Sequence, residues 1–163
     1  MREFLRTTAA WMLVAFLGET VIAPMIDIKG VAPDFSVIAL VILALAAGAT
    51  PATAGGFILG LVQDLANPTL LGLQAVCKSV LGFGVGSLRS RLVYGVPVVE
   101  GTLVALAVIA HDFVFLLVQS RMTDDAFLLP LVTQTVPVAL YSGLVGIPMI
   151  RFAEFLGILR QED

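Results

Sequence analysis

Residues 51–88 decide the fold of this chain: PATAGGFILGLVQDLANPTLLGLQAVCKSVLGFGVGSL. Two apolar runs, 51–66 and 68–88, stand on either side of the short break at Asn67 and Pro68. Each run carries glycines at intervals of four, and this small-residue spacing lets two helix backbones approach closely in lipid. The stretch therefore predicts two helices that pack against each other as an antiparallel hairpin.

Residues that recur every four positions share one helix face. They are Gly56, Gly60 and Asp64 in the first helix and Lys78, Gly82 and Gly86 in the second. Docking these faces together places Asp64 and Lys78 at the same end of the hairpin, where an ion pair between them is plausible. Their offset along the helix axis is about 9 Å at 1.5 Å per residue. Glu19 or Asp112 therefore competes with Asp64 as the partner of Lys78.

The composition indicates that apolar helices make up the whole chain. Of the 163 residues, 59% are hydrophobic and 13% are charged, and the mean hydropathy is +1.03. Soluble domains carry roughly 25% charged residues, whereas a membrane-spanning helix needs ~20 mostly apolar residues. We therefore expect an all-α integral membrane protein, a six-helix transmembrane bundle that forms a single domain over 1–163. The helices are expected at about 7–26, 34–49, 51–66, 68–88, 97–120 and 125–150.

Three of the expected helices depart from a straight, full-length span. The helices at 34–49 and 51–66 are short, and they form either a tight pair through the Gly48–Pro51 turn or a single interfacial hairpin. In the last helix, Pro137 falls in the middle of the membrane and should free the carbonyl of Thr133, because proline has no N–H to donate. We interpret this as a kinked structural helix in preference to a moving gate.

The basic residues between the expected helices predict the orientation. Lys and Arg favour the cytoplasmic side of a membrane. With both termini inside, the cytoplasmic side holds Arg2, Arg6, Arg89, Arg91, Arg151 and Arg160, and the outer side holds Lys29 and Arg121. This bias predicts a multi-pass membrane protein, surrounded by lipid, with both termini in the cytoplasm. The net charge of -3 leaves no basic patch that would bind nucleic acid.

Polar residues within the expected spans gather on one side. An ionisable side chain at the centre of a bilayer costs ~2.5–3.5 kcal/mol, so it usually faces protein or water. The expected topology places these residues in the outer half of the bilayer: Glu19, Asp64, Lys78, His111, Asp112 and Gln134. We expect them to form a shared polar centre, either as a network that fixes helix packing or as a pocket for a small ligand or a partner.

The sequence offers no credible reactive centre. It contains one histidine and one cysteine, too few for the usual metal-ligand patterns, and we expect no cofactor. The neighbours His111 and Asp112 should point about 100° apart on a helix, so we do not expect them to form an orienting pair. The inner halves of the helices hold no polar residues that would continue a proton or ion path. We therefore expect a protein that is not an enzyme.

These residues together resemble the rod shape-determining protein MreD family. The resemblance rests on Pro33–Asp34 opening a second helix, on Gly56-Phe57, Gly60-Leu61 and Asp64, and on a short loop before a glycine-rich fourth helix. Its specific part covers residues 33–88, and the later helices match in number and hydropathy alone. Asp34, Gly56, Gly60 and Asp64 are the positions that the resemblance marks as family-type residues with a structural role.

The resemblance implies a non-enzymatic inner-membrane scaffold of the bacterial cell-elongation machinery. Its implied partners are MreC, a single-span periplasmic protein, and through it MreB filaments, the glycosyltransferase RodA and a class B penicillin-binding transpeptidase. The implied fold is similar to that of the substrate-binding subunits of energy-coupling-factor vitamin transporters. The face that binds a partner and the formation of a homodimer stay open at this point.

Two rival functions remain. The first is a transporter subunit that captures a vitamin-like ligand in the outer polar centre. Subunits of that class commonly show an Ala-x-x-x-Ala face on the first helix, but among Ala9, Ala10, Ala15 and Ala23 no two are four apart. The second rival is an intramembrane enzyme, which the lack of a reactive centre disfavours.

Overall fold

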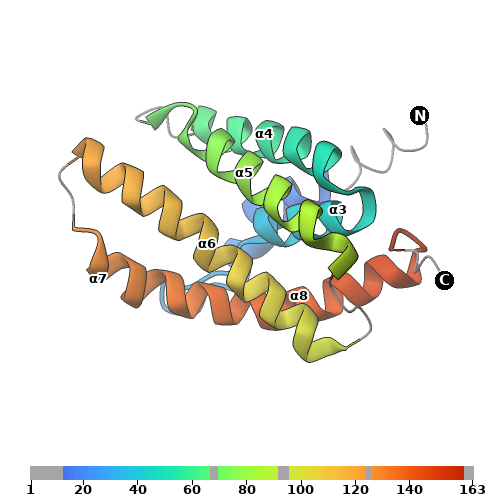
Figure 1. Cartoon of the computed structure of the whole chain (residues 1–163). Helices are drawn as coiled ribbons and strands as arrows, with labels where there is room; N and C mark the ends of the chain where they lie inside the picture. Colours follow the sequence, from blue (N-terminus) through green and yellow to red (C-terminus); the bar gives the residue numbers. More distant parts are fainter. Residues whose placement is uncertain (1–12, 67–69, 92–95, 124–125, 160–163) are drawn as a thin grey trace.

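The computed structural model describes residues 13–66, 70–91, 96–123 and 126–159 (Figure 1). The regular elements in these ranges are all helices, apart from one isolated β-bridge between Ile28 and Val31. The all-α class expected from the sequence is therefore confirmed. In chain order the elements are η1 (Gly18–Ile22), α2 (Ala23–Met25), α3 (Phe35–Ala47), α4 (Ala49–Ala66), α5 (Leu73–Leu88), η3 (Arg89–Arg91), α6 (Pro97–Thr123), α7 (Leu128–Pro130), η4 (Leu131–Thr135) and α8 (Val136–Phe155).

These elements join into fewer continuous rods. The first helix is described over Leu13–Met25 and includes η1 and α2, and the last runs over Leu128–Phe155 through α7, η4 and α8. Two of the expected boundaries are wrong by about one turn, because α5 begins at Leu73 where residue 68 was expected, and the last helix ends at Phe155 where residue 150 was expected. The other described boundaries agree within a few residues.

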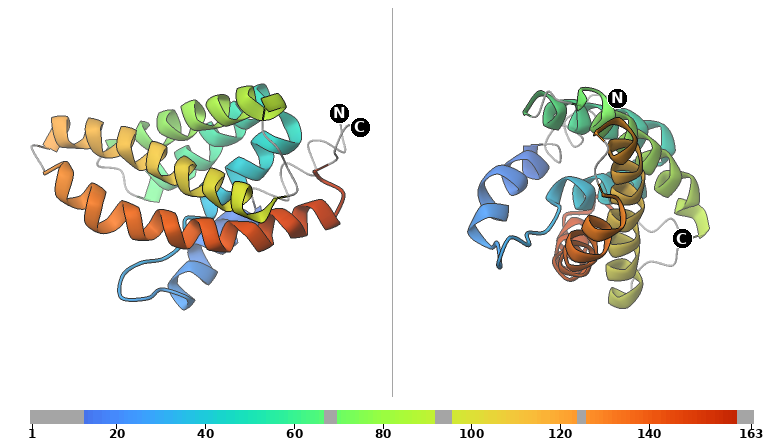
Figure 2. Two further views of the ribbon diagram at one scale, coloured as in Figure 1. Left: turned by 60° about the horizontal axis from the view of Figure 1, so that its bottom comes forward. Right: turned by 90° about the vertical axis from the view of Figure 1, so that its left-hand side faces the viewer.

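Helix α3 lies at the centre of the molecule. It contacts η1, α4, α5, α6 and α8, and every side chain from Phe35 to Leu45 is buried. Its 13 residues span about 20 Å at 1.5 Å per residue, which is shorter than the ~30 Å hydrocarbon layer of a bilayer. Figure 2 shows the first helix on one side of α3 and α5 on the other. By length and burial α3 is a core helix around which the longer helices pack.

Helices α4 and α5 pack backbone against backbone. A Cβ atom added to Gly56 would overlap the carbonyl oxygen of Lys78, and one added to Gly82 would overlap the carbonyl oxygen of Ala52. Gly60 and Gly86 stand equally close to the backbones of Ala75 and Ala49. Only glycine leaves room for such an approach, so these four positions set the distance between the two helices.

A second glycine contact joins α6 to α8. A Cβ atom on Gly143 would lie 2.8 Å from the carbonyl oxygen of Gly101, and one on Gly146 would lie 2.9 Å from a methyl group of Val104. This pair was not predicted from the sequence, because Gly101 stands alone in its helix and Gly143 and Gly146 are three residues apart. Among the described residues, Pro97–Thr123 and Leu128–Phe155 are the two helices that are long and apolar enough to cross a membrane.

The last helix adjusts to its prolines through a wide turn. The segment Leu131–Thr135 is a π-helix that stands directly before Val136 and Pro137. In a π turn the backbone hydrogen bond joins residues five apart, one more than in an α-helix, and such turns commonly mark irregular sites in long helices. The Thr133 hydroxyl donates to the carbonyl of Leu129 at 2.7 Å. A π turn thus stands directly before Val136 and Pro137, and the kink and the freed Thr133 carbonyl expected from the sequence stay predictions.

Candidate functional site

A polar cavity of about 340 Å³ lies between the first helix, α4, α5, α6 and the last helix. We define the polar cavity by the six sequence-predicted residues that line it: Glu19, Asp34, Lys78, His111, Asp112 and Gln134. Residues far apart in the sequence thus meet in one place. Asp64, the remaining polar residue singled out from the sequence, is not among the residues that line this cavity.

Lys78 is the most deeply buried ionisable group in the cavity, with 1% of its surface exposed. Its Nζ donates to Gln74 Oε1 at 3.3 Å and lies 3.3 Å from His111 Nε2. His111 Nε2 also lies 3.0 Å from the same Gln74 oxygen, so the lysine, the glutamine and the histidine meet at one point. The histidine thereby links the ammonium group to a further acceptor on its other side.

That further acceptor is Asp112, which corrects the sequence analysis. His111 Nδ1 lies 3.0 Å from Asp112 Oδ1, although these neighbours were expected not to pair. The expectation was wrong because the 100° step separates the Cα–Cβ directions, whereas the side-chain ends can still converge. The Thr135 hydroxyl donates to the other oxygen, Oδ2, at 2.8 Å and holds the carboxylate in place. The π turn that contains Thr135 is thus tied to α6.

Asp64 does not pair with Lys78 as the spacing suggested. Its two carboxylate oxygens accept hydrogen bonds from three backbone N–H groups at the start of α5, those of Gly72, Gln74 and Ala75, at 3.0–3.1 Å. The first N–H groups of a helix have no partner within the helix and carry partial positive charge, so a carboxylate is favoured there. Asp64 on α4 therefore closes the hairpin by capping its neighbour, which also explains why α5 begins at Leu73.

A second group of polar residues gathers around Ser36, which is 3% exposed. The backbone N–H of Ser36 donates to Glu19 Oε2 at 3.3 Å, and its hydroxyl donates to Asp34 Oδ1 at 2.6 Å. Gln63 Nε2 donates to the same hydroxyl at 3.2 Å. Asp34 Oδ1 also accepts from the N–H of Val37 and so caps α3. The first helix, α3 and α4 thus meet at one serine.

Within the described ranges, no group of three or more His, Cys, Asp and Glu residues is arranged to hold a metal ion. The cavity therefore offers hydrogen-bonding groups of both signs in an apolar surrounding. Such an arrangement can fix the packing of five helices, and it can hold a small polar group.

A comparison with known protein families matches the chain over residues 1–157 to the rod shape-determining protein MreD. The chain belongs to the MreD family. This membership, together with two helices apolar enough to cross a membrane, identifies a membrane protein with a role in rod shape determination. No curated protein and no solved structure matches the chain. Neither the vitamin-transporter alternative nor the likeness to its substrate-binding subunits gains support from these comparisons.

The residues that carried the resemblance to MreD all lie at helix contacts or helix starts. Asp34 caps α3, and its backbone N–H donates to the Ser142 hydroxyl on α8 at 2.9 Å. Gly56 and Gly60 lie against the backbone of α5, and Asp64 caps that helix. In this MreD-family chain the four positions are therefore placed to shape the helix packing.

Sequence reasoning missed several polar partners in the cavity region, namely Ser36, Gln63, Gln74, Thr135 and Ser142. A signal was present for two of them. Gln74 stands four residues before Lys78 on the same helix face, and a glutamine such as Gln63 in an apolar helix must find a hydrogen-bond partner in lipid. The hydroxyl residues gave no such signal, because serine and threonine can bond to the preceding turn of their own helix.

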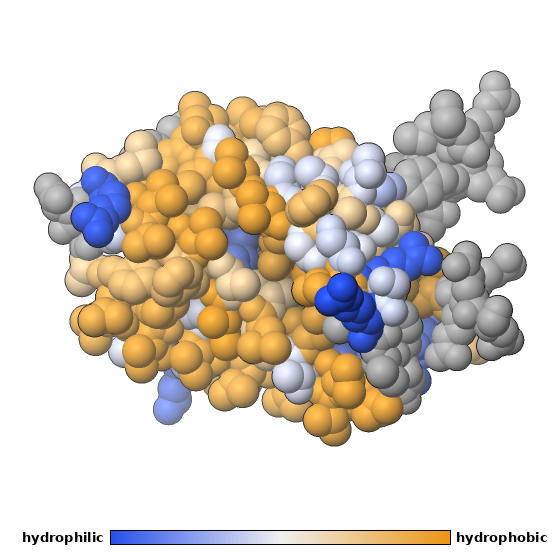
Figure 3. Space-filling view, in the orientation of Figure 1, coloured by the Kyte–Doolittle hydropathy of each residue, from blue (hydrophilic) through white to orange (hydrophobic). Residues whose placement is uncertain are grey.

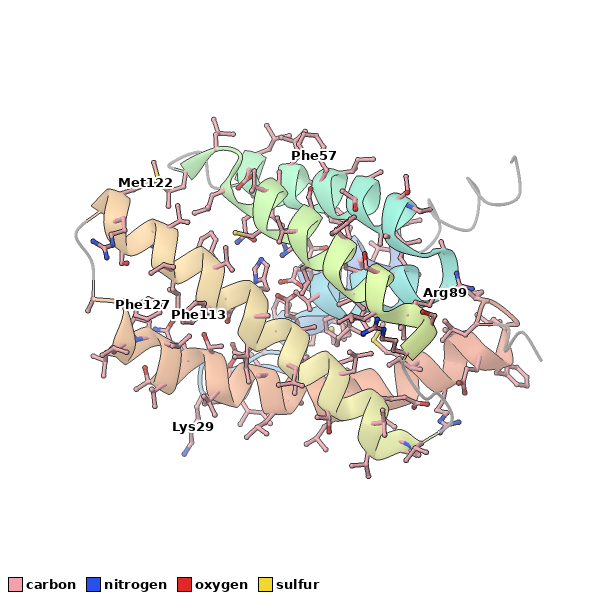
Figure 4. All side chains as sticks on the ribbon, viewed as in Figure 1. Lys29, Phe57, Arg89, Phe113, Met122 and Phe127 are labelled. Atoms are coloured by element: carbon pink, nitrogen blue, oxygen red, sulfur yellow. The ribbon has the colours of Figure 1, made fainter. Side chains whose placement is uncertain are left out.

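A separate ion pair joins α6 to α8 away from the cavity. Arg151 Nε lies 3.3 Å from Glu100 Oε2, and Arg151 also donates to Glu154 Oε2 at 3.1 Å. The Glu100 side chain is 2% exposed, whereas that of Arg151 is 38% exposed. Arg89 at the end of α5 and Met122 near the end of α6 lie at opposite ends of the molecule (Figure 4). Glu100, in the first turn of α6, belongs to the Arg89 end.

Proposed function

We propose that this chain is a non-enzymatic membrane scaffold of the bacterial cell-elongation machinery. In this proposal it maintains rod shape by binding MreC and by linking MreB with the peptidoglycan synthases, RodA and a class B penicillin-binding transpeptidase. One observation carries the proposal: the side chains that could do chemistry point inward, whereas apolar side chains cover the outside of the long helices (Figure 3). Such a surface suits side-by-side association with other helices in a bilayer.

The proposed topology is multi-pass in the bacterial inner membrane, with both termini in the cytoplasm. The position of Arg89 at one end of the molecule (Figure 4) supports this orientation, because basic residues favour the cytoplasmic side. Arg151 pairs with Glu100 in the first turn of α6. Met122 and Phe127 lie toward the opposite end (Figure 4) and would face the periplasm. In this orientation the polar cavity lies nearer the outer leaflet.

We place the docking surface for the MreC helix on the α4–α5 hairpin. A hollow of about 590 Å³ lies there, lined by Thr50, Thr53, Ala54, Phe57, Ile58, Ser79 and Phe83. Small side chains such as Ala54 and Ser79 let a second helix approach closely, and Phe57 and Phe83 supply apolar contact area. A single-span protein such as MreC offers an occupant of the right shape, namely one apolar helix.

The substitution Ala54→Phe tests this surface. The added ring should fill the hollow and lower the amount of MreC that co-purifies from gently solubilised membranes by at least about tenfold, a change equivalent to 1.4 kcal/mol. The matched control is Leu140→Phe, an exposed position on α8 outside the hollow. Equal recovery of MreC with both variants would place the partner elsewhere.

The scaffold role itself is tested by depletion in a rod-shaped host that has no second copy. We expect the cells to become round and MreC to lose its association with the synthases, because the link between them is removed. Unchanged rod growth after clean deletion would count decisively against the proposed function. Native mass spectrometry would separate the rivals, because a second polypeptide bound in stoichiometric amount indicates a scaffold.

A further inference from the structure

The region of the polar cavity around Ser36 is rich in hydrogen-bond acceptors. Gln63 Oε1 is buried and accepts no hydrogen bond from any described residue. Its Nε2 already donates to Ser36, so the amide is fixed with its oxygen unsatisfied. A buried acceptor without a partner costs about 1–3 kcal/mol. This orphaned oxygen therefore points to a missing donor.

Two carboxylates stand beside this amide, each held by Ser36. Glu19 and Asp34 form no ion pair within the described ranges, and Asp34 Oδ2 accepts no hydrogen bond there. Asp112, the third carboxylate of the cavity, uses both of its oxygens on His111 and Thr135. The single ammonium group that lines the cavity, Lys78, donates to Gln74 and lies 3.3 Å from His111 Nε2. The lining thus has an excess of negative charge on the Ser36 side.

We propose that the Ser36 side of the polar cavity binds a primary ammonium group carried on a small head. An ammonium group offers three N–H donors and one positive charge. The three acceptors Glu19, Asp34 and Gln63 match those donors, and the charge offsets one of the two carboxylates. Lys78 then keeps its own partners. A quaternary ammonium group has the same charge but no N–H, so the site discriminates against it.

The geometry is compatible with two sources of this group, the ethanolamine headgroup of a lipid and a free amine. Figure 3 shows a hydrophilic recess near the centre of the face crossed by α5 and α6, with apolar residues around its rim. A headgroup can enter such a recess while its acyl chains stay against the apolar surface. A volume of about 340 Å³ is sufficient for an ethanolamine-sized head.

The test measures thermal unfolding of the full chain in nanodiscs of phosphatidylcholine, followed by circular dichroism. A ligand that binds only the folded state raises Tm. We expect Tm to rise when ethanolamine is added, or when part of the lipid is replaced by phosphatidylethanolamine, and to stay unchanged with choline. A rise with the lipid alone assigns the site to a headgroup, and a rise with both assigns it to either source. Each of these results supports the ammonium site.

Variants locate the effect. Asp34→Asn keeps an oxygen to cap α3, and Glu19→Gln keeps an acceptor for Ser36 N–H, so both should fold and both should lose at least about nine-tenths of the Tm shift. Glu154→Gln, which changes a carboxylate outside the cavity, should retain the full shift. Native mass spectrometry gives an independent readout, because bound phosphatidylethanolamine should survive on the parent chain and be absent from Glu19→Gln.

Four results would overturn the ammonium site. They are no Tm shift with either amine, an equal shift with choline, a saturable shift of the same size with sodium ions in a potassium buffer, and a shift retained in both cavity variants. The third would make the site one for an inorganic cation. All of these measurements are independent of MreC, so the scaffold proposal stands or fails separately.

Discussion

At the scale of single residues, Asp64 shows how a buried charge can serve the backbone. It is 2% exposed, and its partners are three N–H groups at the start of α5. Those groups would otherwise lack partners at the point where the chain reverses between α4 and α5. One carboxylate therefore satisfies the donors that a tight hairpin leaves over, and no ion pair with Lys78 is needed.

This role predicts the effect of two substitutions at position 64. Asp64→Ala removes all three acceptor contacts and should lower the free energy of unfolding by at least about 2 kcal/mol. Asp64→Asn keeps one acceptor oxygen and should cost less. Thermal unfolding in detergent micelles, followed by circular dichroism, measures both. A parent-like Tm for Asp64→Ala would show that water satisfies these N–H groups equally well.

The sequence predicted most of the residues that line the polar cavity, but it predicted few of the hydrogen bonds between them. Glu19, Lys78 and Asp112 lie on different helices, and hydropathy alone predicts that such residues seek one another inside a bundle. The hydrogen-bond partner of each residue depends on its side-chain torsion angles, which move the polar atoms by a few ångströms. The Asp112 carboxylate contacts His111 with one oxygen and Thr135, on a helix far along the chain, with the other. No residue spacing in the sequence predicts the second contact.

At the scale of helices, the α4–α5 hairpin was predictable because its glycines repeat at a fixed interval. The same reasoning failed for α6 and α8, where single glycines meet without a repeat. The π turn at Leu131–Thr135 was predictable only as an irregularity near Pro137, since several local geometries can compensate a missing N–H. Helix contacts made by a regular residue pattern can thus be predicted from the sequence, whereas contacts between isolated residues cannot.

Two glycine substitutions separate packing from helix propensity in the hairpin. Gly60→Ala would place a methyl group in the backbone of Ala75 and should destabilise the fold by about 1–3 kcal/mol. Gly84→Ala lies on α5 with nothing within 4 Å of the new Cβ, so it should be neutral or stabilising by up to about 1 kcal/mol. Tm values in the same micelles compare the two. Equal Tm values would mean that the helices move apart without cost.

At the scale of the whole molecule, the described helices are not equivalent. The long helices Pro97–Thr123 and Leu128–Phe155 expose apolar side chains, whereas α3 is enclosed. The composition predicted the membrane location because it lacks the charge that an aqueous surface requires. It did not predict that α3 is a core helix, since apolar residues face lipid and protein interior alike.

The proposed topology gives a labelling experiment on intact cells. Cys77 is buried and is the one cysteine in the sequence, so a Cys77→Ala background accepts single cysteines. A cysteine at position 125 should react with an impermeant thiol reagent from the periplasm, and one at position 90 should react only after the membrane is opened. The reverse pattern would invert the orientation and move the polar cavity to the inner leaflet.

The enclosure of α3 has a consequence for biosynthesis. This helix leaves the ribosome before most of the helices that surround it, and the N–H of Asp34, the residue that caps its start, bonds to Ser142, 108 residues later in the chain. Until α8 is made, the Asp34 N–H lacks this partner, and an unpaired N–H group is costly inside a bilayer. We therefore expect quality-control proteases to degrade a nascent chain that stops before α8. The last helix completes the hydrogen bonding at the start of α3.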